Sequence, residues 1–309
     1  MAHTVFIDGG AGTTGLEIAD RLEGRKEFDL VRLNEGERKD EDCRRTALNF
    51  ADFVILCLPD DAARDAVDMI DPESGTRIID ASTAHRTAPG WIYGFPELVG
   101  DSVVAGADRV SNPGCYPTGF LALIAPLVRA RLLPRDWPYT VNAVSGYSGG
   151  GKSLIQFFEG DGNNIAFRDY GLGLDHKHLP EMQSKAGLTY PPVFAPAVVP
   201  GYRGMVVEVP LQITAMRSAS PPAELREELA RYFADAPLVT VHDEEVGELV
   251  LHKDAPPSDR LDLYVFANKD GSMARLVAVL DNLGKGASGA AVQSLNLMAG
   301  CDPMAGLRL

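Results

Sequence analysis

The sequence predicts an α/β protein, with a doubly wound parallel sheet followed by an α+β domain whose sheet is largely antiparallel. In the first third of the chain, short apolar strands alternate with helical patterns, which is typical of a parallel sheet covered on both faces. Beyond about residue 135 the strands become longer, and one clear helix over 223–233 interrupts them. We place the first domain at 1–114 and the second at 115–284.

The individual elements follow from short apolar runs and from helical spacing. In the first domain, helices are expected over 14–22 and 60–69, and strands at 5–7, 29–33, 53–58 and 77–80. In the second domain, strands are expected at 139–144, 193–199, 206–214, 261–267 and 275–280. The last apolar residues recur at helical spacing, so we expect an amphipathic helix within 285–309 that returns to complete the first domain.

Composition excludes several classes of partner. The chain has 309 residues and a formal net charge of −14, which argues against nucleic acid or an anionic membrane surface as the main partner. Its four cysteines are scattered and look reduced. No stretch approaches the roughly 18 apolar residues of a membrane helix, and no basic leader precedes the first strand. We therefore expect a cytoplasmic protein that acts on small molecules.

A glycine-rich turn follows the first strand and opens the first helix. The stretch Gly9 to Gly15 has the spacing G-x-x-G-x-x-G, a variant of the Rossmann fingerprint. Its first glycine allows a tight turn, its second lets the backbone approach a pyrophosphate, and its third permits close packing of helix on sheet. The fold is therefore predicted to be Rossmann-like, and the candidate cofactor contacts are Gly9, Gly12, Thr13, Thr14 and Gly15.

The residues after the second strand carry a mixed signal about the cofactor. Glu35 suits a ribose hydroxyl, as in NAD sites, whereas Arg38 and Lys39 suit the 2′-phosphate of NADP. A solvated loop is the alternative for all three.

Cys115 is the candidate nucleophile. Pro113 and Gly114 demand a tight turn before it, Pro117 suits the first position of a helix, and the apolar run 120–124 continues that helix. Unpaired N–H groups at a helix N-terminus favour a thiolate. The alternative, a buried cysteine that merely fills a turn, does not need the flanking prolines and glycine.

One loop matches two known motifs, one from nucleotide-binding proteins and one from serine hydrolases. Gly146–Ser153 satisfies the P-loop pattern G-x-x-x-x-G-K-[ST], and Gly146–Gly150 fits the G-x-S-x-G elbow of serine hydrolases. The helix after it is short, however, because residues 153–159 run into the polar stretch 160–164. We therefore expect a loop whose N–H groups and Lys152 hold a phosphate other than that of a nucleoside triphosphate.

A histidine pair offers a base for the cysteine. His178 and His176 flank a lysine, and Glu181 is near enough in sequence to orient an imidazole or to bind a polar substrate group. Zinc needs at least three protein ligands, and no other motif with metal-like spacing accompanies the pair, so we expect no metal.

With these residues assembled, the chain resembles the N-acetyl-gamma-glutamyl-phosphate reductases of arginine biosynthesis, in their shorter form. The resemblance covers the whole length. Its most specific part is the cysteine motif, because the related aspartate-semialdehyde dehydrogenases lack the sequence Gly-Cys-Tyr-Pro-Thr. It rests on residues 9–15, 93–98, 112–118, 145–152, 178–181 and 281–287.

The resemblance implies NADPH-dependent reduction of N-acetyl-glutamyl 5-phosphate to N-acetylglutamate 5-semialdehyde through a cysteine thioester. It implies Cys115 as nucleophile, His178 as general acid and base, and Asn282 at the nicotinamide end of NADP. It also implies a homo-oligomer, a dimer or a tetramer. Candidate substrate-binding residues are Ser145, Gly146, Lys152, Glu181 and Arg203.

Other functions stay open at this point. The acyl phosphate could be aspartyl or carrier-linked, the loop could belong to a P-loop nucleotide hydrolase or kinase, and the fold could serve as a nucleotide sensor without turnover. The segment Asp80–Arg86 follows the family only loosely, which leaves the roles of Ser82 and Arg86 undecided.

Overall fold

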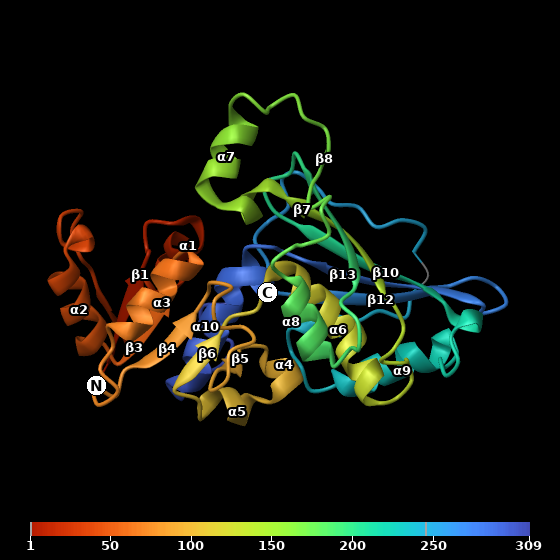
Figure 1. Cartoon of the computed structure of the whole chain (residues 1–309), viewed down its shortest axis with the longest axis horizontal. Helices are drawn as coiled ribbons and strands as arrows, with labels where there is room; N and C mark the ends of the chain where they lie inside the picture. The colour runs from red at the N-terminus through yellow and green to blue at the C-terminus, as the bar shows by residue number, and fades with distance from the viewer. Residues whose placement is uncertain (1, 245) are drawn as a thin grey trace. The chain divides into compact units, whose positions relative to one another are not determined.

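The computed structural model describes residues 2–244 and 246–309, and it divides into two compact units (Figure 1). Unit 1 comprises the residues up to Pro113 together with Ala287–Leu307. Unit 2 comprises Gly114–Gly286 and the last two residues, Arg308 and Leu309.

Unit 1 is built on a sheet of six strands in the order β2-β1-β3-β4-β6-β5, and every neighbouring pair is parallel. The run Phe53–Leu56 is buried at every position, as a strand covered on both faces requires. The predicted parallel sheet is confirmed. Its strands are β1 (His3–Asp8), β2 (Phe28–Val31), β3 (Phe53–Leu56), β4 (Arg77–Asp80), β5 (Ile92–Tyr93) and β6 (Arg109–Ser111).

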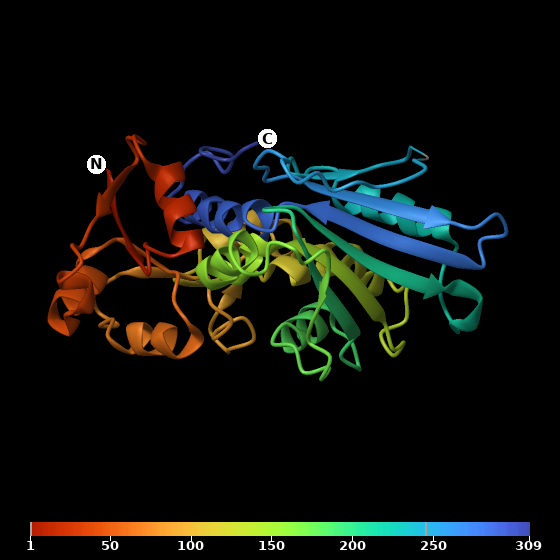
Figure 2. The same cartoon turned by 90° about the horizontal axis from the view of Figure 1, so that it is seen from above.

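Helices cover both faces of this sheet (Figure 2). Val5 belongs to one core cluster, with side chains from α1 (Thr13–Leu22) and α10 (Gly289–Met298). Its neighbour Phe6 points to the opposite face and joins a second cluster, with α2 (Glu41–Phe50) and α3 (Asp60–Asp68). The C-terminal helix α10 thus packs on the first sheet.

Several short elements of unit 1 were absent from the prediction. Helix α2 buries only Ala47 and Leu48, so its apolar stripe is too narrow to stand out in the sequence. Five further elements have five residues or fewer: the 3₁₀ turn η1 (Glu37–Lys39), the helices α4 (Pro96–Val99) and α5 (Asp101–Ala105), and the short strands β5 and β6.

Unit 2 is built on a sheet of seven strands in the order β11-β12-β13-β10-β7-β9-β8. Four of the six pairings are antiparallel, and β11–β12 and β7–β9 are parallel, so the predicted largely antiparallel sheet is confirmed. The strands are β7 (Thr140–Gly146), β8 (Arg168–Asp169), β9 (Val193–Val199), β10 (Met205–Gln212), β11 (Val239–Val241), β12 (Leu261–Ala267) and β13 (Met273–Leu280).

Helices α6 (Cys115–Arg129) and α9 (Pro222–Tyr232) pack on one face of this sheet. Along β10 burial alternates residue by residue, so one face of the strand is covered and the other is open. The expectation of a single clear helix after residue 135 was wrong. Besides α9, unit 2 contains α7 (Gly151–Glu159), α8 (Leu179–Ala186), the 3₁₀ turns η2 (Tyr147–Gly150) and η3 (Ile213–Ala215) and the first three residues of the π-helical turn η4 (Gly284–Ser288).

These additional helices are short, and Pro180 and the glycines around residue 150 obscured them in the sequence.

Within residues 2–244 and 246–309, no helix is both long and apolar enough to cross a bilayer.

Candidate active site

Cys115 is the first residue of α6, and the extended residue Gly114 precedes the helix. The side chain is partly buried. The prediction that Pro117 occupies the first helical position was wrong, since it is the third residue of the helix. It is tolerated there because N–H groups in the first turn have no partner within the helix. Cys115 therefore lies at a helix N-terminus, where the macrodipole favours a negative charge.

Glu181 holds the turn that precedes Cys115. The N–H of Gly114 donates to Oε1 of Glu181 at 2.9 Å, and the Glu181 side chain is only 1% exposed. At the other side of the turn, both the N–H and the hydroxyl of Thr118 donate to the Gly114 carbonyl. The Glu181 carboxylate thus contacts the backbone beside the nucleophile, a positioning contact that the sequence did not suggest.

His178 is brought to the start of α6 through its ring contacts. It is the residue immediately before α8 and is 6% exposed. Its ring lies 6.0 Å from the ring of Tyr116, the neighbour of Cys115. Together with the Glu181 contact, this places the first turn of α8 beside the first turn of α6.

His176 supports His178. The backbone N–H of His178 donates to Nδ1 of His176 at 3.2 Å, and the two rings pack edge to face at 4.7 Å. Burial lowers the pKa of His176, and the neighbouring Lys177 lowers it further. A neutral His176 can accept that N–H, so the second histidine of the predicted pair positions the first.

The other three cysteines have environments that disfavour the thiolate. Burial raises the pKa of Cys57 to about 12. The pKa of Cys43 is raised by its hydrogen bond to Asp40, and that of Cys301 is raised by burial. Because the thiolate is the reactive form, these thiols are poor competitors for an electrophile.

Gly286 packs against the nucleophile. A Cβ placed on Gly286 would lie 2.8 Å from Cβ of Cys115 and 3.1 Å from the carbonyl oxygen of Asp281. The π-helical turn η4 therefore approaches Cys115 so closely that only glycine fits. The sequence showed this glycine within the motif 281–287 but offered no signal of its contact.

We expect Gly286→Ala to lower kcat by about 10²-fold, because a displacement of about 1 Å at a reacting group has effects of that size. The added methyl must push Cys115 or η4 away. Steady-state kinetics with circular dichroism as a folding check measure the change. Gly106→Ala is the control, since a Cβ there makes only an ordinary contact, 3.4 Å from the carbonyl oxygen of Ser102. Equal effects of the two substitutions would contradict the proposed contact.

The loop after β7 does not offer its first N–H groups to a ligand. The N–H groups of Gly146, Tyr147 and Ser148 donate to the carbonyls of Gly204, Gly201 and Tyr202. These three donors are therefore not available to a phosphate, and the prediction that the loop and Lys152 hold one stays a prediction for the residues that follow Ser148. The N–H groups of residues 146–148 are used instead in long-range hydrogen bonds to the loop 201–204.

The remaining predicted substrate residues lie on or near the same loop. Ser145 is buried, and its hydroxyl donates to the Gly146 carbonyl at 2.9 Å. Lys152 is exposed, on α7. Arg203 makes a buried ion pair with Asp281, with 2.7 Å between Nη1 and Oδ2.

Asn282 links three segments of unit 2. Its Oδ1 accepts the N–H of Gly204, and its Nδ2 donates to the hydroxyl of Ser148, both at 2.9 Å. The amide is 1% exposed. Its visible role is to hold the loop 146–148 against the loop 201–204.

The glycine turn of unit 1 has the geometry of a dinucleotide site. Gly9 has φ +80°, and a Cβ on it would lie 2.3 Å from the carbonyl oxygen of Cys57. A Cβ on Gly15 would lie 2.7 Å from Cα of Gly10, and Gly12 immediately precedes α1. The buried hydroxyl of Thr13 has no hydrogen-bond partner among the described residues. A close turn with an unsatisfied polar atom at a helix N-terminus fits a pyrophosphate. Thr14 is the next residue of the same first turn.

The cations proposed for a 2′-phosphate are exposed. Arg38 and Lys39 lie on η1, and Nζ of Lys39 is 3.2 Å from the carboxylate of Glu35. The sequence analysis did not point to a third cation, Arg44 on α2, which pairs with Asp8 at the end of β1 at 2.7 Å.

The undecided residues after β4 have structural partners. The hydroxyl of Ser82 donates to Asp80, and Nδ1 of His85 lies 2.6 Å from the same buried carboxylate. Nε of Arg86 donates to the carbonyl of Asn112. These contacts shape the turn after β4. In the parts of the chain that the structure describes, no cluster of three or more His, Cys, Asp or Glu side chains could hold a metal ion.

Family models match both units. Residues 4–105 match the NAD binding domain of semialdehyde dehydrogenases, and residues 115–282 match their dimerisation domain. Aspartate semialdehyde dehydrogenase II of Vibrio cholerae, complexed with ASA, has a similar fold, with a TM-score of 0.69, 16% identity and coverage of 97% of this chain and 99% of that one. The enzyme from Candida albicans with NADP gives a TM-score of 0.61 at 16% identity, over 96% and 98%. The class of protein is thus the semialdehyde dehydrogenases.

Curated relatives narrow this class. N-acetyl-gamma-glutamyl-phosphate reductase of Trichormus variabilis is 47% identical over 98% of both chains, and that of Burkholderia lata is 48% identical over 98% of both. The protein of the same name from Brucella ovis is 46% identical over 97% of this chain and 100% of its own. The chain belongs to the N-acetyl-gamma-glutamyl-phosphate reductase family.

Proposed function

We propose that this protein reduces N-acetyl-glutamyl 5-phosphate to N-acetylglutamate 5-semialdehyde with NADPH and releases phosphate, in the cytoplasmic biosynthesis of arginine. The observation that carries the proposal is the position of Cys115 at the start of α6, with the preceding turn held by Glu181. The substrate is inferred from the name of full-length relatives, which are about 47% identical to this chain.

The chemistry begins at the thiol. Sγ of Cys115 attacks the acyl carbonyl carbon, the bond from that carbon to the phosphate oxygen breaks, and phosphate leaves with the bonding electrons. His178 accepts the thiol proton. The product of this step is a thioester on Cys115. The acyl group stays activated in this thioester, because it has not been hydrolysed.

The second half of the reaction reduces that thioester. NADPH, when bound, supplies the hydride for the carbonyl carbon. Collapse of the resulting tetrahedral centre breaks the carbon–sulfur bond and releases the aldehyde, and the sulfur leaves as a thiolate. His178 returns its proton to that thiolate. The expelled phosphate takes up one proton from water, so the complete reaction consumes NADPH and one proton, and Cys115 is ready for another cycle.

The glycine turn of unit 1 is the proposed cofactor site. Gly9, Gly12 and Gly15 allow the close backbone approach, and the hydroxyls of Thr13 and Thr14 lie in the first turn of α1. Asn282 acts here by holding the loop 146–148, in addition to the nicotinamide contact that the family resemblance implies.

Anionic groups of the substrate are assigned to Arg203 and Lys152, with Ser145 and Gly146 shaping the loop between them. Arg203, which forms a buried ion pair with Asp281, has the planar guanidinium group that suits a carboxylate or phosphate. Lys152 is exposed and acts as a mobile point charge.

The reaction is tested in reverse with phosphate and NADP. We expect N-acetylglutamate semialdehyde to yield NADPH at a much higher kcat/KM than aspartate semialdehyde does. Turnover with aspartate semialdehyde alone would assign a different acyl phosphate. Saturable NADP binding without turnover of either aldehyde would make the protein a nucleotide sensor.

We expect the double substitution Arg38→Ala/Lys39→Ala to raise the KM for NADP by about tenfold or more and to leave the KM for NAD nearly unchanged. A charge-assisted hydrogen bond contributes about 1.5–3 kcal/mol, and 1.4 kcal/mol is a factor of ten. The two cofactors are compared by steady-state kinetics. Arg64→Ala, which removes an exposed ion pair on α3, is the control. Equal efficiency of the wild type with NAD and NADP would remove this role.

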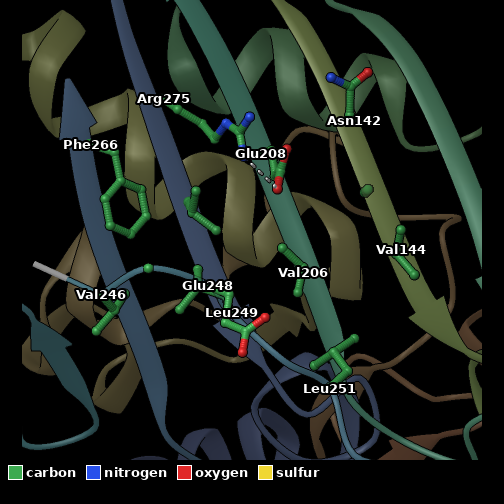
Figure 3. Close-up of a pocket in the computed structure, with 13 residues that line it drawn as sticks. Asn142, Val144, Val206, Glu208, Val246, Glu248, Leu249, Leu251, Phe266 and Arg275 are labelled. Carbon is green, nitrogen blue, oxygen red and sulfur yellow. Dashed lines mark ion pairs between the residues drawn. The ribbon is translucent and has the colours of Figure 1, made fainter. Parts of the chain in front are cut away.

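The open face of the second sheet is the proposed surface for a second copy of the chain. It carries a groove of about 610 Å³, where Val144, Val206 and Phe266 lie beside the segment 246–251 (Figure 3). The match of this unit to a dimerisation domain supports the assignment. We expect light scattering to give a molar mass of at least twice the 33.2 kDa of one chain. A monomer at micromolar concentration would contradict it.

A further inference from the structure

Asp281 is a buried acid that takes no part in the steps of the proposed reaction. It is the first residue after β13 and is 6% exposed. Its carboxylate accepts three hydrogen bonds, from Nη1 of Arg203 at 2.7 Å, from the N–H of Leu283 at 2.9 Å and from the N–H of Ser258 at 3.2 Å. A buried carboxylate is costly unless its oxygens are paired, so these donors fix one orientation of the side chain.

The two carboxylate oxygens hold different parts of unit 2. Oδ1 accepts the N–H of Leu283, in the short segment that leads into η4. Oδ2 accepts from Ser258 and from Arg203, which are distant from Asp281 in the sequence. Asp281 therefore ties the start of η4 to the segment at residue 258 and to the loop 201–204.

The backbone of Asp281 reaches the nucleophile through η4. Its carbonyl accepts the N–H of Gly286 at 2.9 Å, which is the bond that a π-helical turn makes. Gly286 packs on Cys115, as shown above. The start of the turn is equally tight, because a Cβ on Gly284 would lie 1.9 Å from the carbonyl oxygen of Ser258. A shift of Asp281 is therefore passed on to the side chain of Cys115.

The side chain of Asp281 fixes the direction of Arg203. The arginine side chain is 10% exposed, and its guanidinium carbon lies 5.5 Å from the ring centre of Tyr202. An arginine has many rotamers, and an ion pair that selects one of them leaves less entropy to be lost when a substrate binds. The candidate substrate residue and the support of the nucleophile thus depend on the same acid.

We propose that Asp281 is a positioning residue that sets two groups of the active site at once. It directs the guanidinium group of Arg203, and through η4 it holds the side chain of Cys115. An ion pair that served stability alone would leave the behaviour of both groups unchanged when it is removed from a folded protein. The part that concerns Arg203 rests on the proposed function, whereas the part that concerns Cys115 does not.

Two substitutions of Asp281 separate these roles. Asp281→Asn keeps an oxygen for the N–H of Leu283 and loses the charge that pairs with Arg203. In the reverse reaction we expect its KM for N-acetylglutamate semialdehyde to rise by at least about tenfold, the effect of one charge-assisted hydrogen bond, with kcat near the wild-type value. Asp281→Ala loses all three contacts, so we expect the same rise in KM and a kcat lower by about 10- to 100-fold.

Alkylation of Cys115 by iodoacetamide, without substrate or cofactor, measures the second role. The thiolate is the reactive form, and the N–H groups at the start of α6 favour it only while the side chain is held beside them. In Asp281→Ala we expect the midpoint of the pH profile of alkylation to rise by about one pH unit, so that the rate below the midpoint falls about tenfold. Asp281→Asn should keep the wild-type midpoint. Peptide mass spectrometry follows Cys115 separately from the other thiols.

Leu238→Ala is the control for lost stability, since Leu238 is a buried apolar residue immediately before the edge strand β11. It should lower Tm and leave the midpoint for Cys115 unchanged. An unshifted midpoint in Asp281→Ala, an equal shift in Leu238→Ala, or an unchanged KM in both Asp281 variants would overturn the proposal. Asp281→Ser replaces Asp281→Ala if that variant does not fold, because its short side chain cannot span the three donors. If no aldehyde is turned over, the proposed function fails, and the alkylation profiles still decide whether Asp281 positions Cys115.

Discussion

Cys115→Ala is expected to lose at least about 10⁴-fold in kcat while NADP affinity and circular dichroism stay unchanged. Loss of a covalent nucleophile has effects of this order or larger, because the remaining site can only bind and orient the reactants. Alanine keeps the helical start of α6 and the Gly114–Glu181 hydrogen bond. Steady-state assays in both directions measure the loss.

The same thiol should dominate chemical labelling. A free thiol has a pKa of about 8.5 and is only partly ionised at neutral pH, so the rate of alkylation reports the thiolate. Raised pKa values at Cys43, Cys57 and Cys301 leave these thiols slow. Limited iodoacetamide treatment followed by peptide mass spectrometry should therefore find Cys115 modified first, with activity lost in proportion.

Cys43→Ala is the matched control for this experiment. Cys43 is a partly buried thiol on α2 whose loss should not alter turnover. Near-normal turnover by Cys115→Ala, or labelling of Cys43 ahead of Cys115, would remove the thioester mechanism and most of the case for an acyl-phosphate reductase.

His178→Ala is expected to lower kcat by about 10²- to 10⁴-fold, with a smaller change in the KM for substrate. Its imidazole carries the proton that leaves the thiol and later returns to the sulfur. We also expect the pH dependence of kcat to lose one of its limbs, because the group that titrates there is gone. His178→Asn retains a polar side chain of similar size and should be equally slow.

The exposed His252→Ala provides the comparison for His178, since its side chain lies on the surface of unit 2. It should retain the wild-type rate and pH profile. If His178→Ala kept an unchanged pH profile and lost activity only through a raised KM, the residue would bind substrate and transfer no proton.

The structural features that the sequence determined by itself depend on neighbouring residues in the chain. The alternation of short apolar runs with helical patterns predicted the parallel sheet of unit 1, because a strand that is buried on both faces is apolar at nearly every position. The turn from Gly9 to Gly15 and the start of a helix at Cys115 could also be predicted from the sequence. Glycine and proline restrict or free the backbone at their own positions, so neighbouring residues reveal them.

Only the tertiary structure decided which groups meet around Cys115. Glu181 was recognised as a candidate, yet its bond to the Gly114 N–H joins residues 67 positions apart. The approach of Gly286 to Cys115, and the use of the Gly146–Ser148 N–H groups by the loop 201–204, are likewise long-range. Such contacts arise when separate elements pack, and packing distance leaves no periodic signal along the chain. The pattern of residues therefore identified the nucleophile, and the fold determined what holds it in place.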